Sequence, residues 1–207
     1  TRTDKELTAD DYTFSEHLLT IKTAGEYTLS GKANSNDFRV KVGDGLATTL
    51  TIKDLTINTV HTNSEENYTS GYSPLDFSEA GETKLILVGR NVLTARGNNP
   101  AVYAPQVKSI PKQEEAIPLT IRGEGSLVAN GGRDWPGIGN DGSAKISIEG
   151  GDIDAKGGVA AAGIGGSKGS WFDSIVIKGG HVTAKGEYYD IGCGDSLRAE
   201  LSHGFKR

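Results

Sequence analysis

Residues 146–158 read ISIEGGDIDAKGG, and residues 175–186 read IVIKGGHVTAKG. Each phrase contains two short runs in which aliphatic and polar residues alternate, with glycines at the turn between the runs. Alternation with a period of two is typical of a strand that buries one face. A related phrase, LILVGRNVLTARG, occupies residues 85–97, and looser copies bring the total to about six. A repeat of roughly 30 residues predicts a solenoid, because one copy can bury its apolar side only against its neighbours.

A third apolar segment follows the second strand of each copy, so each coil is predicted to have three strand sides and three corners. We therefore predict an all-β fold, a parallel β-helix of about six coils and roughly 30 Å in length at ~4.8 Å per coil. A β-sandwich also has short strands, but it gives no reason for a repeat of this length. We expect one domain over residues 1–207, with a lead-in or cap at 1–17, coils at 18–195 and a closing segment at 196–207.

The repeat aligns into three predicted interior rows, one for each side of the coil. The first row is Ile21, Ile52, Leu87, Ile121, Ile148 and Ile177; the second is Leu29, Ile57, Leu93, Leu127, Ile153 and Val182; the third is Val40, Leu75 or Phe77, Val102, Ile138, Ile164 and Ile191.

Composition narrows the classes of function. The chain has 207 residues, 29 of them glycine, no methionine, one cysteine (Cys193) and a net charge of −5. Lysine and arginine are interspersed and form no basic stripe, which argues against a nucleic-acid partner. No apolar run approaches the ~20 residues that a membrane-spanning helix needs. The missing initiator methionine predicts either a mature fragment that has lost its signal peptide or a trimmed fragment that never included one.

The sequence also resembles known families. Residues 136–194, which begin PGIGNDGSAKISIEGGDIDAKGG, resemble the GIGG and GGxIxAxGG repeats of Firmicutes surface-anchored proteins, and the earlier repeats resemble the clostridial carbohydrate-binding family of right-handed, pectate-lyase-like β-helices. The resemblance implies a secreted or cell-surface protein of a Gram-positive bacterium that binds a polysaccharide or a host glycan without necessarily cleaving it. It also makes calcium a candidate ligand. No catalytic residue is carried over by motif.

Aromatic residues give the first candidate binding site. Trp135 and Tyr188 stand three positions before Ile138 and Ile191, so stacking would place them two coils apart, roughly 10 Å. Asp134 and Tyr189 are their neighbours in the sequence, and Trp171 in the neighbouring loop is predicted to add aromatic surface nearby. Sugar rings stack on exposed aromatic faces, which predicts a glycan site. The alternative is that these rings shield the corner of the coil.

Two further functions remain open. The irregular segments around Tyr68 and Tyr72 and around Gln113 and Glu114 have the composition of protein-binding loops, which predicts an adhesin for a host protein such as an immunoglobulin or a mucin. A calcium-dependent polysaccharide lyase would need several carboxylates around one ion. The candidate groups for such a site are Asn34, Asn36, Asp37 and Asp44; Asp134, Asn140 and Asp141; and Asp152 and Asp154.

Overall fold

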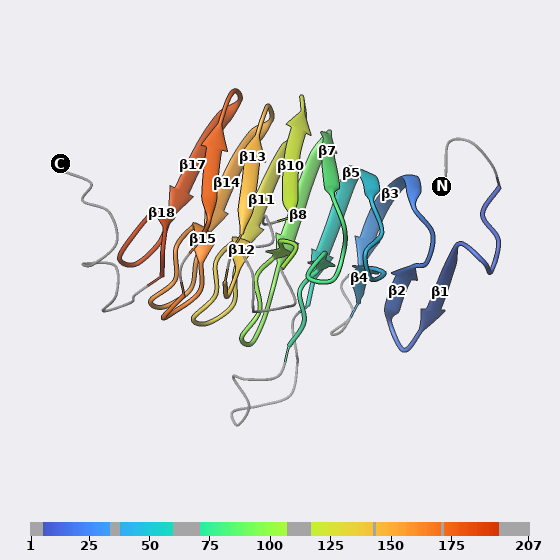
Figure 1. Ribbon diagram of the computed structural model, residues 1–207, viewed down its shortest axis with the longest axis horizontal. Helices are drawn as coiled ribbons and strands as arrows, with labels where there is room; N and C mark the ends of the chain where they lie inside the picture. The colour runs from blue at the N-terminus through green and yellow to red at the C-terminus, as the bar shows by residue number, and fades with distance from the viewer. Residues whose placement is uncertain are drawn as a thin grey trace.

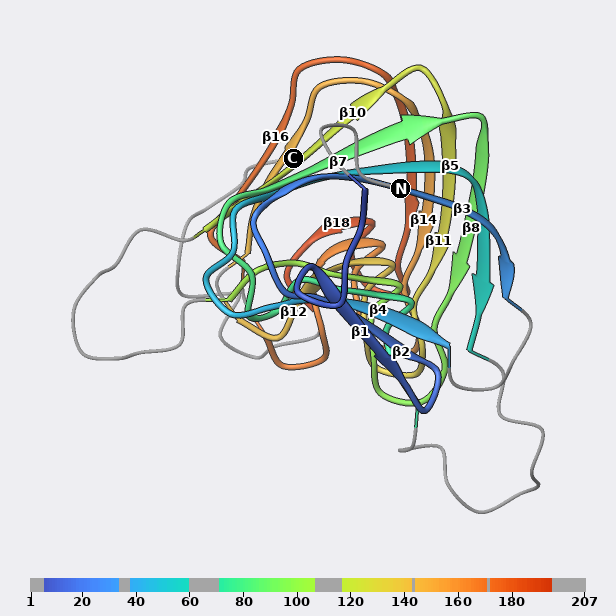
Figure 2. The same cartoon turned by 90° about the vertical axis from the view of Figure 1, so that its right-hand side faces the viewer.

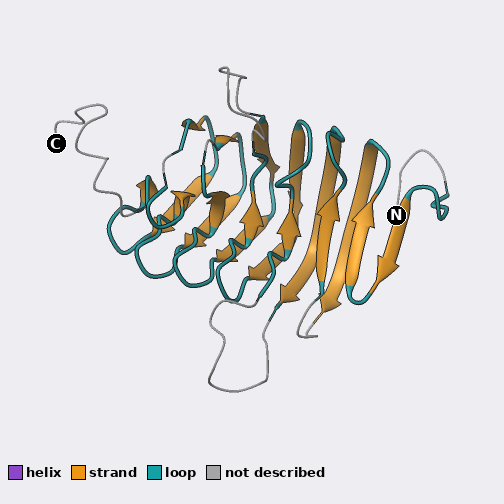
Figure 3. Cartoon of the chain, turned by 60° about the horizontal axis from the view of Figure 1, so that its bottom comes forward, coloured by secondary structure: helices purple, strands orange, loops and turns teal. Residues whose placement is uncertain are grey.

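The computed structural model describes residues 6–33, 38–59, 71–106, 117–142, 144–170 and 172–194. Within these ranges the chain forms strands and turns and no helix, as the colouring of Figure 3 shows. The strands stack in order from the N-terminal to the C-terminal end (Figure 1). The predicted all-β parallel β-helix is confirmed.

Each coil contributes one strand segment to each of three faces. The first face comprises the N-terminal halves of β3 (Gly25–Ala33) and β5 (Thr48–Asn58), then β7 (Thr83–Val88), β10 (Pro118–Gly123), β13 (Lys145–Ile148) and β16 (Ser174–Ile177). The second comprises the C-terminal halves of β3 and β5, then β8 (Arg90–Thr94), β11 (Ser126–Asn130), β14 (Asp152–Lys156) and β17 (His181–Lys185). The third comprises β2 (Leu18–Ile21), β4 (Arg39–Val42), β6 (Leu75–Asp76), β9 (Val102–Tyr103), β12 (Ile138–Asn140), β15 (Ile164–Gly166) and β18 (Ile191–Gly192).

The coil is right-handed, as predicted. In the end-on view of Figure 2 the N-terminal coils are nearest the viewer, and the chain runs along β7, down β8 and back across the third face in a clockwise direction as it recedes. The N-terminal end carries a hairpin in which β1 (Tyr12–Ser15) pairs antiparallel with β2. The first strand of this hairpin lies within the segment 1–17, and its second strand, β2, is already part of the third face. The predicted closing segment, 196–207, lies outside the described residues.

The third interior row is confirmed residue by residue. Val40 pairs in register with Leu75, Leu75 with Val102 and Val102 with Ile138, and the row continues through Ile164 to Ile191. Of the two alternatives in the third coil, Leu75 occupies the row. All members before the last coil are buried, whereas Ile191 is 42% exposed because no described coil follows it.

The first predicted row is wrong at its N-terminal end and at one step in the middle. Ile21 belongs to β2 on the third face, where it pairs with Val42. Leu87 pairs with Ile52 but then with Gly123, whereas Ile121 pairs with Leu85. A shift of two residues leaves the same side of each strand facing inward, so the alternation could not reveal it. The remaining part of the row, Ile121, Ile148 and Ile177, stacks as predicted.

The second predicted row contains the same two-residue error. Leu93 pairs with Ile57 as predicted, but its next neighbour is Ala129 rather than Leu127. Leu29 lies on the first face, paired with Ile52. The last three members, Leu127, Ile153 and Val182, stack as predicted.

A buried asparagine holds the corner between the first and second faces. The Asn91 side chain is 0% exposed; its Oδ1 accepts a hydrogen bond from the Leu55 N–H at 3.0 Å, and its Nδ2 donates to the carbonyl oxygens of Val88 and Ser126, both at 3.1 Å. The strand ladder is irregular here, because Asp54 is an extra residue in β5. Asn91 therefore satisfies backbone groups of three successive coils that the ladder leaves unpaired.

Candidate functional site

Two aromatic side chains meet on the outside of the third face. Tyr103 is the last residue of β9 and points outward because its neighbour Val102 lies in the interior row. Trp135 lies in the corner loop that precedes β12. The two ring centroids are 5.3 Å apart and the ring planes meet at 63°, an edge-to-face arrangement that aromatic pairs favour. Both residues are half-buried, so part of the pair faces solvent.

The corner loop fixes the backbone of Trp135. The Trp135 N–H donates to the Gly132 carbonyl oxygen at 3.3 Å, and the Trp135 carbonyl oxygen accepts a hydrogen bond from the Gly158 N–H of the next coil at 3.0 Å. A side chain at Gly131 would collide with the carbonyl oxygens of Trp135 and Pro136, so this tight corner requires glycine. The stacking of corner loops thus sets the place of the indole.

Polar groups surround the Tyr103 hydroxyl. Tyr103 Oη donates to Asp141 Oδ1 at 3.3 Å, and Gln106 Nε2 donates both to Tyr103 Oη at 3.1 Å and to the same Asp141 oxygen. The buried Asn140 brings these groups together: its Nδ2 donates to the Pro105 carbonyl oxygen at 3.1 Å, and its Oδ1 accepts from the Gly142 N–H at 2.9 Å. The segment after β9 and the end of β12 are therefore tied side by side.

The electrostatic surroundings of Tyr103 are negative. Burial is the largest cause that raises the pKa of Tyr103 above its ordinary value, followed by the charge and hydrogen bond of Asp141 and then the charge of Asp76; the hydrogen bond from Gln106 opposes the rise. Asp76 pairs in register with Tyr103 in the outward column of the third face. The Tyr103 hydroxyl is consequently protonated at neutral pH and acts as a donor.

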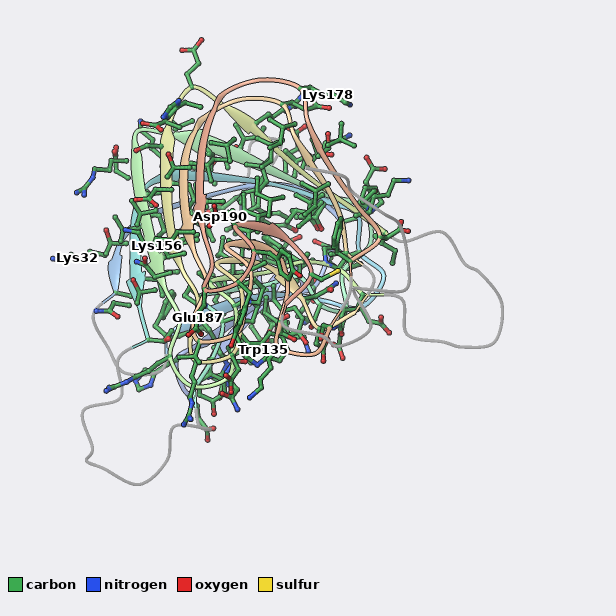
Figure 4. The ribbon with its side chains drawn as sticks, turned by 90° about the vertical axis from the view of Figure 1, so that its left-hand side faces the viewer. Lys32, Trp135, Lys156, Lys178, Glu187 and Asp190 are labelled. Atoms are coloured by element: carbon green, nitrogen blue, oxygen red, sulfur yellow. The ribbon has the colours of Figure 1, made fainter. Side chains whose placement is uncertain are left out.

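The predicted residues Asp134 and Trp135 are thus part of a described surface, but Tyr188 and Tyr189 lie apart from them. Ile138, Ile164 and Ile191 share one row, so Trp135, Ala161 and Tyr188 occupy equivalent positions of successive coils. Tyr188 is 60% and Tyr189 48% exposed, whereas Ala161 is buried. Among the described residues, the Trp135 ring contacts the Tyr103 ring and does not contact Tyr188 or Tyr189. Figure 4 shows Trp135 at one edge of the coil's cross-section and Lys178 at the opposite edge.

The loop residues are held in different ways. The Asp134 carboxylate lies 4.0 Å from Arg133 Nε, and its backbone has a left-handed φ of 60°. The loop with the two tyrosines is anchored through Glu187, whose Oε2 accepts a hydrogen bond from the Ala160 N–H at 2.8 Å. The exposed rings of coil six therefore sit on a loop that is bound to coil five.

The structure describes one residue of the alternative protein-binding loops. Tyr72 is 41% exposed, and the guanidinium carbon of Arg39 lies 3.6 Å from its ring centroid, a cation–π contact. Tyr68, Gln113 and Glu114, and Trp171 of the predicted glycan site, lie outside the described residues.

The described residues contain no group of three or more His, Cys, Asp or Glu side chains that could hold a metal ion. Asn140 of one predicted calcium group uses its side chain to bind backbone, and Asp154 of another lies 3.4 Å from Lys156 Nζ. No helix in the described part of the chain has the length and apolar character needed to cross a membrane.

Sequence reasoning missed Tyr103, Gln106 and Asp76. Tyr103 and Asp76 each follow a residue of the correctly predicted third row, so the period of two already placed both side chains outward. Gln106 left no such signal, because it lies beyond the strand and is positioned by the buried Asn140.

Comparisons with known proteins agree with the architecture. The chain is similar to the beta helix repeat family over residues 119–143, 146–168 and 175–195, which are the last three coils. Comparisons with curated proteins and with solved structures gave no match. The family similarity supports a parallel β-helix family, in agreement with the stacked strands of coils four to six.

Proposed function

We propose that this protein binds carbohydrate without catalysis, as a secreted binding or adhesion module at the surface of a Gram-positive cell. The observation that carries the proposal is the half-exposed pair of Tyr103 and Trp135 with Asp141 and Gln106 beside it. A sugar ring has an apolar face of C–H groups and a polar edge of hydroxyls. An aromatic surface that is flanked by carboxylate and amide groups offers a partner to each.

The shape of the surface favours a chain rather than a single sugar. The rings lie on the outer side of a stack whose coils repeat every ~4.8 Å. Tyr188 and Tyr189, two coils beyond Trp135, offer exposed aromatic surface roughly 10 Å further along the stack. A polysaccharide that follows the stack would contact the ring pair first and these tyrosines with later sugars. The family similarity is compatible with this function, and also with pectate-lyase-like proteins.

The test begins with a glycan array for the wild-type protein and continues with calorimetric titration of a retained oligosaccharide. Trp135→Ala should lower the affinity at least tenfold, because burial of an aromatic side chain against a ligand contributes on the order of 1.5–3 kcal/mol. Trp135→Phe keeps a ring and should bind more tightly than Trp135→Ala. The matched control is Tyr12→Ala, which removes a 36% exposed ring from the N-terminal hairpin and should leave the affinity unchanged.

Melting temperatures of all variants separate loss of binding from loss of folding. Retention of no glycan by the wild type, or equal affinities of wild type and folded Trp135→Ala, would contradict the proposal. Capture of an immunoglobulin or a mucin backbone in place of glycans would favour the host-protein adhesin.

A further inference from the structure

The ring pair lies between two carboxylates of the third face. Asp76 stands one coil before Tyr103, in register with it, and Asp141 follows β12 one coil after it. The Asp141 carboxylate touches the Tyr103 hydroxyl, as described above. Both carboxylates act on Tyr103, because the charge of each raises its pKa. A ligand on the rings therefore lies within reach of both.

Nearby cations do not neutralise these two carboxylates. Lys41 is the neighbour of Asp76 in the outward column, but its Nζ lies 2.6 Å from Glu79 Oε2. Arg133 lies beside Asp134 in the Trp135 loop, at 4.0 Å. Over the described ranges neither Asp76 nor Asp141 forms an ion pair. Within the described part of the chain, the charges of these two carboxylates are therefore not compensated by a direct ion pair.

Each carboxylate also retains hydrogen-bonding capacity. Asp76 Oδ1 accepts from the Ser78 N–H at 2.9 Å, and Asp141 Oδ1 accepts from Tyr103 and Gln106. The Oδ2 atoms of both residues accept no hydrogen bond from the described residues. An ionised carboxylate is an acceptor only, and its strongest hydrogen bonds are with cationic donors.

The chemistry of the ligand follows from this charge. A ligand carboxylate on the rings would meet two like charges that no cation of the described residues pairs, which disfavours it. A protonated amine would meet the negative faces of the rings and two carboxylate oxygens, which favours it. On the basis of the proposed function, we propose that the surface at Tyr103 and Trp135 selects glycans built of amino sugars with free amines and rejects polyuronates, with Asp76 and Asp141 as the specificity-determining residues.

Three oligosaccharides of equal length test this selection: oligomers of glucosamine, of N-acetylglucosamine and of galacturonic acid. The first two share one backbone and differ only in the charge and acetylation of the amine. Titrations are carried out in mildly acidic buffer, in which the sugar amine is protonated. The wild type should bind the glucosamine oligomer at least tenfold more tightly than the N-acetylglucosamine oligomer and the galacturonate oligomer most weakly. Added salt should reduce the preference.

The double variant Asp76→Asn, Asp141→Asn keeps the shape of both side chains and removes their charge. It should bring the ratio of the glucosamine to the N-acetylglucosamine affinity close to one, while the affinity for the N-acetylated oligomer stays within about twofold of wild type. Asp152→Asn removes an exposed carboxylate from the second face and is the charge control, for which the ratio should not change.

The outcomes separate the two proposals. If the wild type binds none of these oligomers and no other glycan, the proposed function fails. If Trp135 is needed for binding but the glucosamine and N-acetylglucosamine oligomers bind equally, or the galacturonate oligomer binds best, only the selection for amino sugars is overturned. If Asp152→Asn lowers the ratio as much as the double variant does, the preference is a general charge effect, and the role assigned to Asp76 and Asp141 is overturned.

Discussion

Replacement of Asn91 by leucine should destabilise the protein even though it makes an interior row more apolar. Position 91 lies inside the coil, in register with Leu127 of the next coil. A leucine there would continue an aliphatic row and would satisfy the hydrophobic pattern of β8. It would also remove the side chain that satisfies the Leu55 N–H and the carbonyl oxygens of Val88 and Ser126.

The magnitude follows from these three bonds. A buried backbone group that loses its partner costs about 1–3 kcal/mol. The Leu55 N–H is wholly buried, whereas the two carbonyl groups are partly buried, so values of about 2 kcal/mol for the N–H and about 1 kcal/mol for each carbonyl are reasonable. Burial of the leucine side chain stabilises the folded protein by on the order of 1.5 kcal/mol, which offsets part of this loss. The free energy of unfolding should therefore fall by about 2–3 kcal/mol.

Urea unfolding followed by circular dichroism measures this change as a lower midpoint at constant slope. The matched control is Asn130→Leu, which removes one hydrogen bond, from Nδ2 to Thr94 Oγ1 at 3.2 Å, on the outer side of the second face. The control should change the free energy of unfolding by less than about 1 kcal/mol. An Asn91→Leu variant as stable as the control or the wild type would refute the reasoning that the corner depends on its polar side chain.

Two more predictions concern the backbone and a surface ion pair. Gly139→Ala should lower the melting temperature strongly, because Gly139 has a φ of 149° and an added Cβ would overlap the Gly165 carbonyl oxygen. The control is Gly142→Ala, which should melt near the wild type because an added Cβ there meets nothing within 4 Å. Equal melting temperatures of the two variants would contradict this prediction. Lys178→Gln should raise the pKa of Glu149 toward its ordinary value, because the hydrogen bond and charge of Lys178 hold it low. Because the pKa of Glu149 is lower in the folded than in the unfolded protein, its interaction with Lys178 stabilises the fold at pH values above the unfolded-state pKa. This stabilisation is lost as the pH falls through the folded-state pKa, and the variant should lack it. Carboxyl NMR titration measures the pKa of Glu149, and the same pKa in the variant and the wild type would contradict the prediction.

The three rows differ in how far the sequence could determine them. On the third face each coil from the fourth onward offers one inward aliphatic residue followed by glycine, as in Ile138-Gly139 and Ile164-Gly165, so the alignment has a single solution. On the first face several strands offer two inward aliphatic residues, such as Leu85 and Leu87 in β7. Two alignments that differ by two residues then bury equally apolar side chains, and hydrophobicity cannot choose between them.

Asn91 shows a second limit of the pattern. A period of two from the buried Leu93 places position 91 inside the coil, but it does not explain why an asparagine stands there rather than an aliphatic residue. The Asn91 amide is needed because it hydrogen-bonds backbone groups at the adjacent corner. The need for a buried amide arises from the extra residue Asp54 in β5, a whole coil earlier in the sequence. Local periodicity carries no information about such a partner.

The candidate site was predictable in its position and not in its contacts. Counting back from Ile138 placed Trp135 at a corner, and the structure describes it there. The Trp135 indole packs against Tyr103, which belongs to strand β9 of the preceding coil and not to the equivalent corner loop. A repeat alignment compares equivalent positions of successive coils, so it pairs Trp135 with Tyr188 and overlooks a partner at a non-equivalent position.

A stack of this kind assembles a binding surface from residues that are far apart in sequence but fixed in spacing. Asp76, Tyr103 and Asp141 come from three successive coils, and the strand hydrogen bonds hold those coils at ~4.8 Å intervals. That interval is close to the length of one sugar ring in an extended chain. One side chain per coil can therefore meet one sugar per coil, and a change of charge at a single position alters what is recognised without altering the scaffold. Aspartate and asparagine have nearly the same shape, so a comparison of the wild type with the Asp→Asn variants measures the effect of charge alone.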